Sequence, residues 1–210
     1  MGMTMVQKVL ASHSGKDVVE RGDYVWAKVD GTGLIGPQRE FDKLGLERVF
    51  DPDRVWAVDD HYAPSPHTDA AQQHKEMKEF ARKYGLTHFF EFGRQGIQHQ
   101  IFPEHGYVVP GDLIASADSH TTSYGCFNAM GVPINEEATY VLAFGELWFR
   151  VPATVRFEIV GDLPAYCVGK DIILKIAGDY GTDVGLYKAI EFHGPVVKEF
   201  SMGSRFTMAN

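Results

Sequence analysis

Two stretches, VWAVDDH at residues 55–61 and LIASADSHT at residues 113–121, decide the fold class of this chain. Each is an apolar run that ends in a cluster of Asp and His. Strands that are apolar on both faces are typical of an α/β sheet covered by helices, and the sites of such sheets lie at the carboxyl ends of the strands. The two stretches therefore predict an open α/β sheet with acid/base groups along one edge, and a catalytic site is the leading interpretation.

The remaining sequence alternates helical and strand patterns around these two stretches. Residues 68–84 give the clearest helix, with Thr68 as its cap and Gly85 at its end. We expect further helices at residues 4–11, 41–44, 136–149 and 170–181, further strands at 86–92, 154–161 and 187–194, and no helix at the end of the sequence. This alternation predicts a single α/β domain over residues 1–210, a mixed sheet flanked by helices.

Composition excludes several function classes. The 210 residues are 44% hydrophobic and 23% charged, as in an ordinary globular protein, and the net charge of −8 argues against a nucleic-acid partner. No apolar run reaches the length of about 18 residues that a membrane span needs. Two cysteines, Cys126 and Cys167, fit neither a disulfide scaffold nor a zinc pattern, so we expect a cytoplasmic location.

The first candidate site residues follow the strand at residues 55–58. Asp60 next to His61 can fix the tautomer of the imidazole and make it a proton donor, although the preceding Asp59 could play the same part. His99 follows Gly93 and Gly96, which allow the backbone to approach a ligand closely. The alternative for Asp60 and His61 is a polar turn after the strand, and a lone histidine such as His99 is more often structural than a ligand. Three such groups on one side of a sheet favour a site.

The second group is denser, because Asp118, Ser119 and His120 follow one another directly after the strand at residues 113–117. A hydroxyl at this place can hold a substrate carboxylate, and the imidazole can donate a hydrogen bond to it. The alternative is a strand end capped by Asp or Ser. We interpret five of the six other histidines as structural, with His74 on the surface of its helix: His67, His74, His88, His105 and His193.

These residues lie within a longer stretch, FFEFGRQGIQHQIFPEHGYVVPGDLIASADSHTTSYG at residues 89–125, that resembles the aconitase superfamily. Within it, the pattern is most similar to the branch of 3-isopropylmalate dehydratase and homoaconitase large subunits. The resemblance extends to residues 2–15, 57–64, 170–181, 187–195 and 201–210, and so to nearly the whole chain. It implies the fold of the first aconitase domain.

The resemblance also implies an activity. Members of this superfamily are hydro-lyases that dehydrate a hydroxy di- or tricarboxylate, such as 3-isopropylmalate, and use a [4Fe–4S] cluster as Lewis acid. By resemblance, Asp60, His61, His99, Asp118 and His120 handle the departing hydroxyl, Ser119 binds a substrate carboxylate, and Asn210 lies near the cluster. The implied partners are the remaining large-subunit domains and a swivelling small subunit or domain.

Two departures from the superfamily pattern limit what this chain does alone. Cys126 and Cys167 match none of the cluster cysteines, so we expect no cluster bound to this chain alone, the thiolates to be supplied elsewhere and the isolated chain to be inactive. The loop VDGTGLIGPQ at residues 29–38 is short, which hints at another substrate. Two alternatives stay open: a mononuclear-metal hydrolase or lyase using His61, His99, Asp118 and His120, and a non-catalytic binding module.

Overall fold

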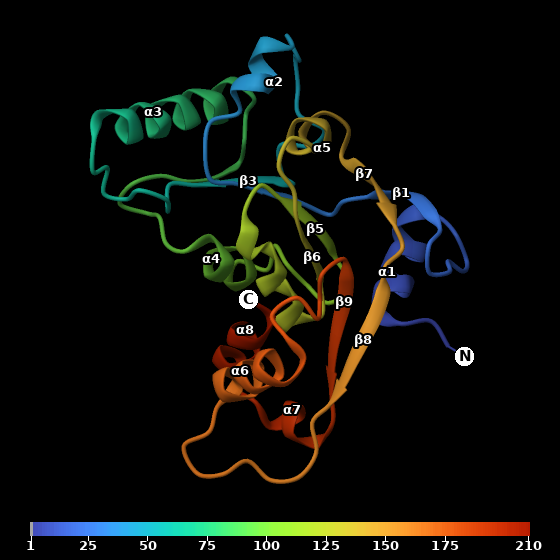
Figure 1. Ribbon diagram of the computed structural model, residues 1–210. Helices are drawn as coiled ribbons and strands as arrows, with labels where there is room; N and C mark the ends of the chain where they lie inside the picture. The colour runs from blue at the N-terminus through green and yellow to red at the C-terminus, as the bar shows by residue number, and fades with distance from the viewer. Residues whose placement is uncertain (1) are drawn as a thin grey trace.

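The computed structural model describes residues 2–210 and has the mixed α/β architecture that the sequence predicts (Figure 1). Its centre is built from two sets of parallel strands rather than from one continuous sheet. One set has the order β2-β3-β4, and the other pairs β5 with β6. The bounds of these strands are Thr32–Leu34 for β2, Val55–Val58 for β3, His88–Phe90 for β4, Leu113–Ser116 for β5 and Met130–Pro133 for β6.

The two sets lie side by side because β2 contacts β5. A parallel bridge joins Gly31 to Ile114, and the backbone N–H of Gly33 donates a hydrogen bond of 2.7 Å to the buried Ser116 Oγ. A side chain at Gly33 would not fit, since its Cβ would lie 2.9 Å from both Gln98 Oε1 and the Phe102 ring. The carboxyl ends of β2, β3 and β5 therefore meet along one edge.

Helices cover both faces of these strands, as the apolar runs predicted. Every residue of β3 and β5 is buried. The helix α3 (Thr68–Lys83) covers one face through Met77 and Phe80, while Phe102 from α4 (Gln98–Glu104) packs in the core on the other. A fully buried side chain of this size stabilises the fold by about 1.5–3 kcal/mol, so this packing fixes the strands that carry the site.

The predicted N-terminal helix is present, and it extends three residues beyond the predicted end at residue 11. The helix α1 (Met5–Ser14) begins with a capping box of Thr4 and Gln7 and ends at Gly15, whose φ of 67° is left-handed. The chain continues through β1 (Tyr24–Lys28) and, after β2, the short helix α2 (Arg39–Lys43).

At α3 the cap is His67, whose Nδ1 accepts from the Ala70 N–H, and not the predicted Thr68.

The predicted helix at residues 136–149 is wrong in its second half. The helix α5 (Ala138–Phe144) ends at Gly145, which adopts a left-handed φ of 67°. The strand β7 (Glu146–Arg150) follows and pairs antiparallel with β1. Leu147 is buried and Trp148 is exposed, an alternation that fits a strand with one covered face.

The C-terminal third forms a parallel crossover of β8 (Ala153–Glu158), α6 (Gly169–Tyr180) and β9 (Lys188–His193). After α7 (Pro195–Glu199) comes a helix that the sequence did not predict, α8 (Met202–Ala209), with the Ser201 hydroxyl accepting from the Ser204 N–H. It packs against α6 and the 3-10 helix η1 (Ser119–Phe127), so the last residue, Asn210, reaches the edge of the central strands (Figure 1).

The single domain over residues 1–210 stays a prediction. Within residues 2–210, no helix has both the length and the apolar character that crossing a membrane requires.

Candidate active site

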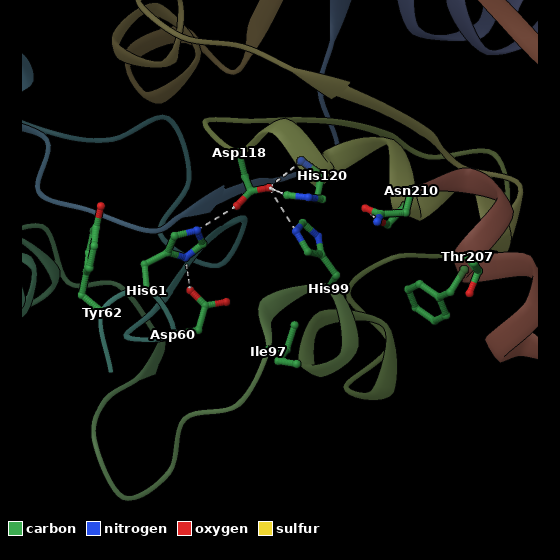
Figure 2. A pocket seen from close by; sticks show the side chains of 11 residues that line it. Asp60, His61, Tyr62, Ile97, His99, Asp118, His120, Thr207 and Asn210 are labelled. Atoms are coloured by element: carbon green, nitrogen blue, oxygen red, sulfur yellow. Dashed lines mark hydrogen bonds and ion pairs between the residues drawn. The ribbon is translucent and has the colours of Figure 1, made fainter. Parts of the chain in front are cut away.

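A cavity of about 610 Å³ lies at the carboxyl edge of β3 and β5 (Figure 2). Four segments far apart in sequence meet there: the loop after β3, the start of α4, the end of β5 with η1, and the end of α8. Six of the seven predicted site residues line the cavity, namely Asp60, His61, His99, Asp118, His120 and Asn210. The structure therefore brings together groups that the sequence separates by up to 150 positions.

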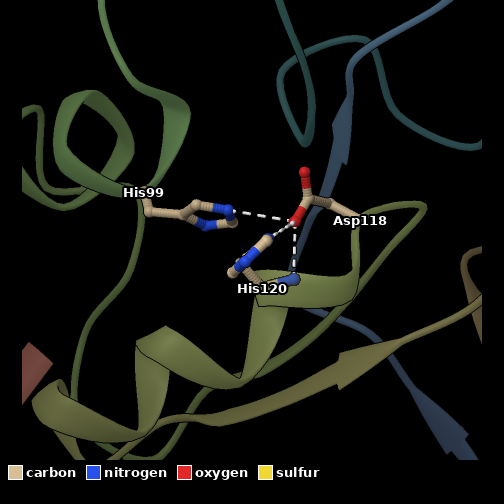
Figure 3. Close-up of side chains that lie close together, drawn as sticks. All are labelled: His99, Asp118 and His120. Carbon is tan, nitrogen blue, oxygen red and sulfur yellow. Dashed lines mark hydrogen bonds and ion pairs between the residues drawn. The ribbon is translucent and has the colours of Figure 1, made fainter. Parts of the chain in front are cut away.

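Asp118 is the centre of the cavity wall. Its Oδ1 accepts hydrogen bonds from the backbone N–H of His120 at 2.6 Å and from His99 Nε2 at 3.1 Å (Figure 3). Its Oδ2 accepts from Gln98 Nε2 at 2.7 Å and lies 3.6 Å from His61 Nε2. With His120 Nδ1 at 3.5 Å from Oδ1, three imidazoles surround one carboxylate whose side chain is only 2% exposed.

This surrounding keeps the carboxylate ionised. Burial on its own raises the pKa of Asp118, but the hydrogen bonds from His99 and the His120 backbone, together with the charges of His99 and His61, lower it to about 2. Above that pH, Asp118 is an acceptor only. Each ring nitrogen that donates to it must therefore carry a hydrogen.

A second carboxylate stands behind His61. Asp60 Oδ1 lies 2.7 Å from His61 Nδ1, and Asp60 Oδ2 accepts the backbone N–H of Gln98 at 2.8 Å. Of the two candidates that the sequence left open, Asp60 is thus the hydrogen-bond partner of His61. Asp59 is buried and is not part of this pair. His61 lies between Asp60 and Asp118 and can exchange a proton with the cavity (Figure 2).

Gln98 joins the two carboxylates, and the sequence analysis missed it. Its side chain is fully buried and donates to Asp118, while its backbone N–H donates to Asp60. Gln98 could have been found from its position directly before His99. Both stand at the start of α4, where consecutive side chains point to different sides and so contact different partners.

His99 is held through one of its two ring nitrogens. Because Nε2 donates to Asp118, a neutral ring has its lone pair on Nδ1. That nitrogen is buried and has no hydrogen-bond partner within residues 2–210. A buried nitrogen without a partner is costly in a purely structural histidine, which favours a functional role.

The two predicted ligand-binding residues lie differently. Asn210 lines the cavity, and its Oδ1 accepts a hydrogen bond of 3.2 Å from the Ser123 hydroxyl. Ser119 is exposed and does not line the cavity, although its Oγ lies 3.3 Å from His120 Nδ1. The structure therefore brings Ser119 next to the predicted site without placing it in the wall.

Further residues of the wall escaped the sequence analysis: Tyr62, Ile97, Ser123, Phe206 and Thr207. The last two belong to α8, the helix that the sequence did not predict. Ser123 lies within the stretch at residues 89–125 that was quoted for its resemblance. Nothing in that stretch marks Ser123 as a site residue apart from its place in η1, two residues after Thr121.

His74 is not on the surface of its helix, as the sequence suggested, but is half-buried. Its Nδ1 lies 2.9 Å from Ser65 Oγ, and its Nε2 lies 2.9 Å from the backbone carbonyl oxygen of His61. Because a carbonyl oxygen only accepts, Nε2 donates. His74 therefore holds the loop that presents His61, and it is a positioning residue.

The cysteines of this chain do not fit an iron–sulfur cluster. Burial raises the pKa of the Cys126 thiol to about 12, whereas a cluster ligand must be a thiolate. Neither Cys126 nor Cys167 lines the cavity. Among residues 2–210, the cavity wall contains imidazole, carboxylate, hydroxyl and amide groups but no thiol.

Comparisons with known proteins agree with this geometry. The chain is 45% identical over 214 residues to a 3-isopropylmalate dehydratase large subunit of Caldicellulosiruptor bescii, covering 99% of this chain and 50% of that protein. It is 46% identical over 216 residues to the protein of the same name from Moorella thermoacetica, covering 100% and 51%. A 3-isopropylmalate dehydratase large subunit 1 of Pyrococcus furiosus is 44% identical over 215 residues, with the same coverage. The chain spans about half the length of the curated relatives it matches.

The family model described as the aconitase family (aconitate hydratase) matches residues 49–210. This range includes every residue that lines the cavity, from Asp60 to Asn210. Since the match covers most of the sequence and the whole site, the chain belongs to the aconitase family.

Proposed function

We propose that this chain is the N-terminal α/β part of a hydro-lyase large subunit that removes water from, and adds it to, a hydroxy di- or tricarboxylate such as 3-isopropylmalate. The observation that carries the proposal is the ionised, buried Asp118 among three imidazoles in an open cavity. The names of the relatives support the same class of reaction. The proposal includes as partners the remaining part of the large subunit and a small subunit.

Dehydration breaks a C–O bond and a neighbouring C–H bond. The departing hydroxide needs a proton to leave as water, and the proton from carbon must go to a base, which the proposal assigns to the other part of the protein. His61, between Asp60 and Asp118, is the proposed donor: its Nδ1–H is held by Asp60, and its Nε2 faces the cavity wall. His120 is proposed to hold the hydroxyl through its remaining nitrogen, and His99, whose Nδ1 is buried, to keep Asp118 in place beside it. In the reverse reaction the same groups take a proton from water.

The [4Fe–4S] cluster that members of this family generally use supplies Lewis-acid assistance to the leaving hydroxyl. The thiols of this chain do not fit its ligation, so the proposal assigns those ligands to the other part of the protein. A cytoplasmic location likewise stays a prediction.

Steady-state dehydration assays on the full-length protein that contains this chain, assembled with its small subunit, test the proposal. His61→Ala and His120→Ala should lower kcat about 10²- to 10⁴-fold, with a much smaller change in KM, because the proton is needed chiefly in the transition state. Ser119→Ala is the comparison variant. It should weaken substrate binding and so raise KM, because Ser119 is the residue assigned to a substrate carboxylate. Near-normal turnover of His61→Ala would remove its assigned role, and failure of the assembled protein to dehydrate any hydroxy di- or tricarboxylate would overturn the function.

A mononuclear-metal site is the second candidate, and one observation favours it. One ligand atom each from His99, Asp118 and His120 lie within 4.8 Å of one another (Figure 3). Two imidazoles and a carboxylate suit zinc or iron. Stoichiometric zinc bound by this chain and lost in His99→Ala would favour that candidate, and a chain that takes up no zinc in equilibrium dialysis would exclude it.

The third candidate, a non-catalytic binding module, makes the opposite prediction for the site. It requires that Asp60, His61 and His120 can each be replaced without consequence in the native organism. Asp118 is buried and accepts hydrogen bonds from three other residues. Such a buried polar network argues against a module whose site residues have no chemical role.

A further inference from the structure

A second, smaller cavity lies beside the first and belongs to no step of the proposed reaction. Its volume is about 310 Å³, and it is lined by Ile35, Gly36, Asp59, His61, Tyr62, Gln73, His74 and Met77. It lies between the carboxyl ends of β2 and β3 and the inner side of α3. His61 and Tyr62 line both cavities, so a ligand at His61 has the second cavity as its neighbour.

The polar centre of this second cavity is Asp59, which is only 4% exposed. Within residues 2–210, no side chain donates a hydrogen bond to its carboxylate, and the backbone of Phe92 is its one hydrogen-bond partner. Burial raises the pKa of Asp59 against the lowering effect of the His74 and Lys78 charges. A buried carboxylate with unused acceptor positions is unfavourable unless a donor reaches it.

The neighbouring groups leave Asp59 available. Both nitrogens of His74 are engaged, with Ser65 Oγ and with the His61 carbonyl oxygen, and Lys78 is paired with Glu91. The residues that line the cavity include no lysine or arginine. Ile35, Met77 and the ring of Tyr62 are the apolar part of the wall, and Gln73 and the two histidines are polar. The cavity therefore combines a buried carboxylate with apolar surface, which suits a hydrocarbon chain that ends in a hydrogen-bond donor.

We propose that the cavity beside Asp59 is a specificity subsite for a substituent of the substrate that ends in an ammonium or hydroxyl group. The proposal rests on the hydro-lyase function proposed above and refines its substrate class: a hydroxy di- or tricarboxylate with a donor-terminated side chain rather than a plain alkyl one. Asp59 accepts the hydrogen bond from the end of that side chain, and Ile35 and Met77 contact its methylene groups. The carboxylates of the substrate stay outside this cavity, because Asp59 repels them.

Binding to this chain tests the subsite directly. The probes are n-butylammonium and, as its anionic counterpart, n-pentanoate, followed by NMR of labelled Ile and Met methyl groups. Butylammonium should shift the Ile35 and Met77 signals saturably, and Asp59→Asn should weaken its binding about tenfold, the usual loss for one charged hydrogen bond. The matched control, Glu79→Gln, removes a charge from the exposed face of the same helix and should leave binding unchanged.

A second variant keeps the test decisive if Asp59→Asn folds poorly. A Cβ atom at Gly36 would have no other atom within 4 Å, and the φ of Gly36 lies outside the left-handed region. Because Gly36 lines the cavity, we expect Gly36→Leu to fold and to narrow the cavity. It should abolish the butylammonium shifts. Equal binding of pentanoate, absence of saturable shifts, or unchanged binding in Gly36→Leu would overturn the subsite.

Kinetics of the assembled full-length protein then connect the subsite with the reaction. The measurement is the ratio of kcat/KM for 3-(4-aminobutyl)malate to kcat/KM for 3-butylmalate, and Asp59→Asn should lower this ratio about tenfold. An unchanged ratio with active protein would overturn the subsite and leave the hydro-lyase function intact. No dehydration of either acid or of any other hydroxy acid would overturn the function, and the binding experiment alone would then decide whether the cavity takes a donor.

Discussion

The two edges of the central parallel strands use the same residue types in opposite ways. At the amino edge, His13 Nε2 lies 2.6 Å from Asp30 Oδ2, and His13 Nδ1 lies 2.7 Å from the Val9 carbonyl oxygen. Asp30 also accepts the backbone N–H of Leu113 at 2.8 Å. At the carboxyl edge, a single carboxylate, Asp118, faces three imidazoles across an open cavity.

The difference separates a structural pair from a reactive group. A carbonyl and a carboxylate only accept, so both nitrogens of His13 donate and the ring is fully paired. At the carboxyl edge, the partners are fewer than the nitrogens, and the buried His99 Nδ1 has none within residues 2–210. A closed pair stabilises the fold, whereas an unsatisfied set can bind a ligand and move protons.

Removing the shared carboxylate should have the largest effect. Asp118→Asn replaces an acceptor with a group that partly donates, which opposes the hydrogens of Gln98 and His99. Turnover of the assembled full-length protein should fall about thousandfold, within the range for loss of acid–base catalysis. Asp112→Asn changes a half-buried carboxyl at the other edge and serves as control in the same assay. Turnover of Asp118→Asn within a few-fold of the unchanged protein would show that the imidazoles do not need their shared carboxylate.

At the amino edge, Asp30→Asn should act on stability instead. It weakens the bonds from His13 and from the Leu113 backbone and removes the attraction to Arg54, whose Nη1 lies 3.5 Å from Asp30 Oδ1. We expect the free energy of unfolding to fall by about 2 kcal/mol, measured by urea denaturation of this chain. Asp53→Asn, on the exposed turn before β3, is the control. An unchanged midpoint for Asp30→Asn would contradict the structural role.

The pH dependence of that stability has a definite sign. The hydrogen bond with Asp30 raises the pKa of His13, against the opposing effect of burial. Burial alone raises the pKa of Asp30, but the bonds from His13 and Leu113 lower it overall. The His13 contribution is complete below its unfolded pKa of about 6.5 and is lost as pH rises through the raised value, while the Asp30 contribution is complete above about 3.9 and is lost as pH falls through the lowered value. The stabilisation lost in Asp30→Asn should therefore be greatest between about pH 4 and 6.5.

Much of the carboxyl edge could be predicted from the sequence because its strands are strongly marked. Val55–Val58 and Leu113–Ser116 are continuous apolar runs, and the polar residues that follow them must meet where parallel strands end. His99 was included only through a resemblance and two nearby glycines. Its actual placement depends on α4, a seven-residue helix with Pro103 inside it, which has little helical signal of its own.

The errors have local physical causes. The helix predicted at residues 136–149 contains Gly145, where a left-handed residue ends α5, and the pairing of β7 with the distant β1 then decides the following residues. The helix α8 is short and gains its stability by packing against η1 and α6. Its contribution to the cavity, Phe206 and Thr207, depends on contacts between segments about 80 residues apart, which local patterns do not contain.

The loop after β3, at the carboxyl edge, gives a prediction of intermediate size. His74→Ala removes the donor that holds the His61 carbonyl and should lower kcat of the assembled protein about tenfold, with little change in KM. His74→Gln, which keeps a side-chain N–H, should recover part of the loss. Lys75→Ala, on the exposed side of the same helix, is the control. Equal losses in the Ala and Gln variants, or a loss in KM alone, would contradict a positioning role.

The smallest effect should come from the cap of the helix that carries His13. The Thr4 hydroxyl accepts the Gln7 N–H, and the Gln7 side chain accepts the Thr4 N–H at 2.8 Å, so Thr4→Ala breaks one of two capping bonds. Stability of this chain should fall by about 1 kcal/mol, while Thr4→Ser should keep most of it. Because α1 packs against β1 and β5 and contributes no residue to the cavity wall, turnover of the assembled protein below its unfolding temperature should not change. A loss of turnover in Thr4→Ala, without loss of folded protein, would mean that the two edges are coupled and that the division between a structural edge and a reactive edge is wrong.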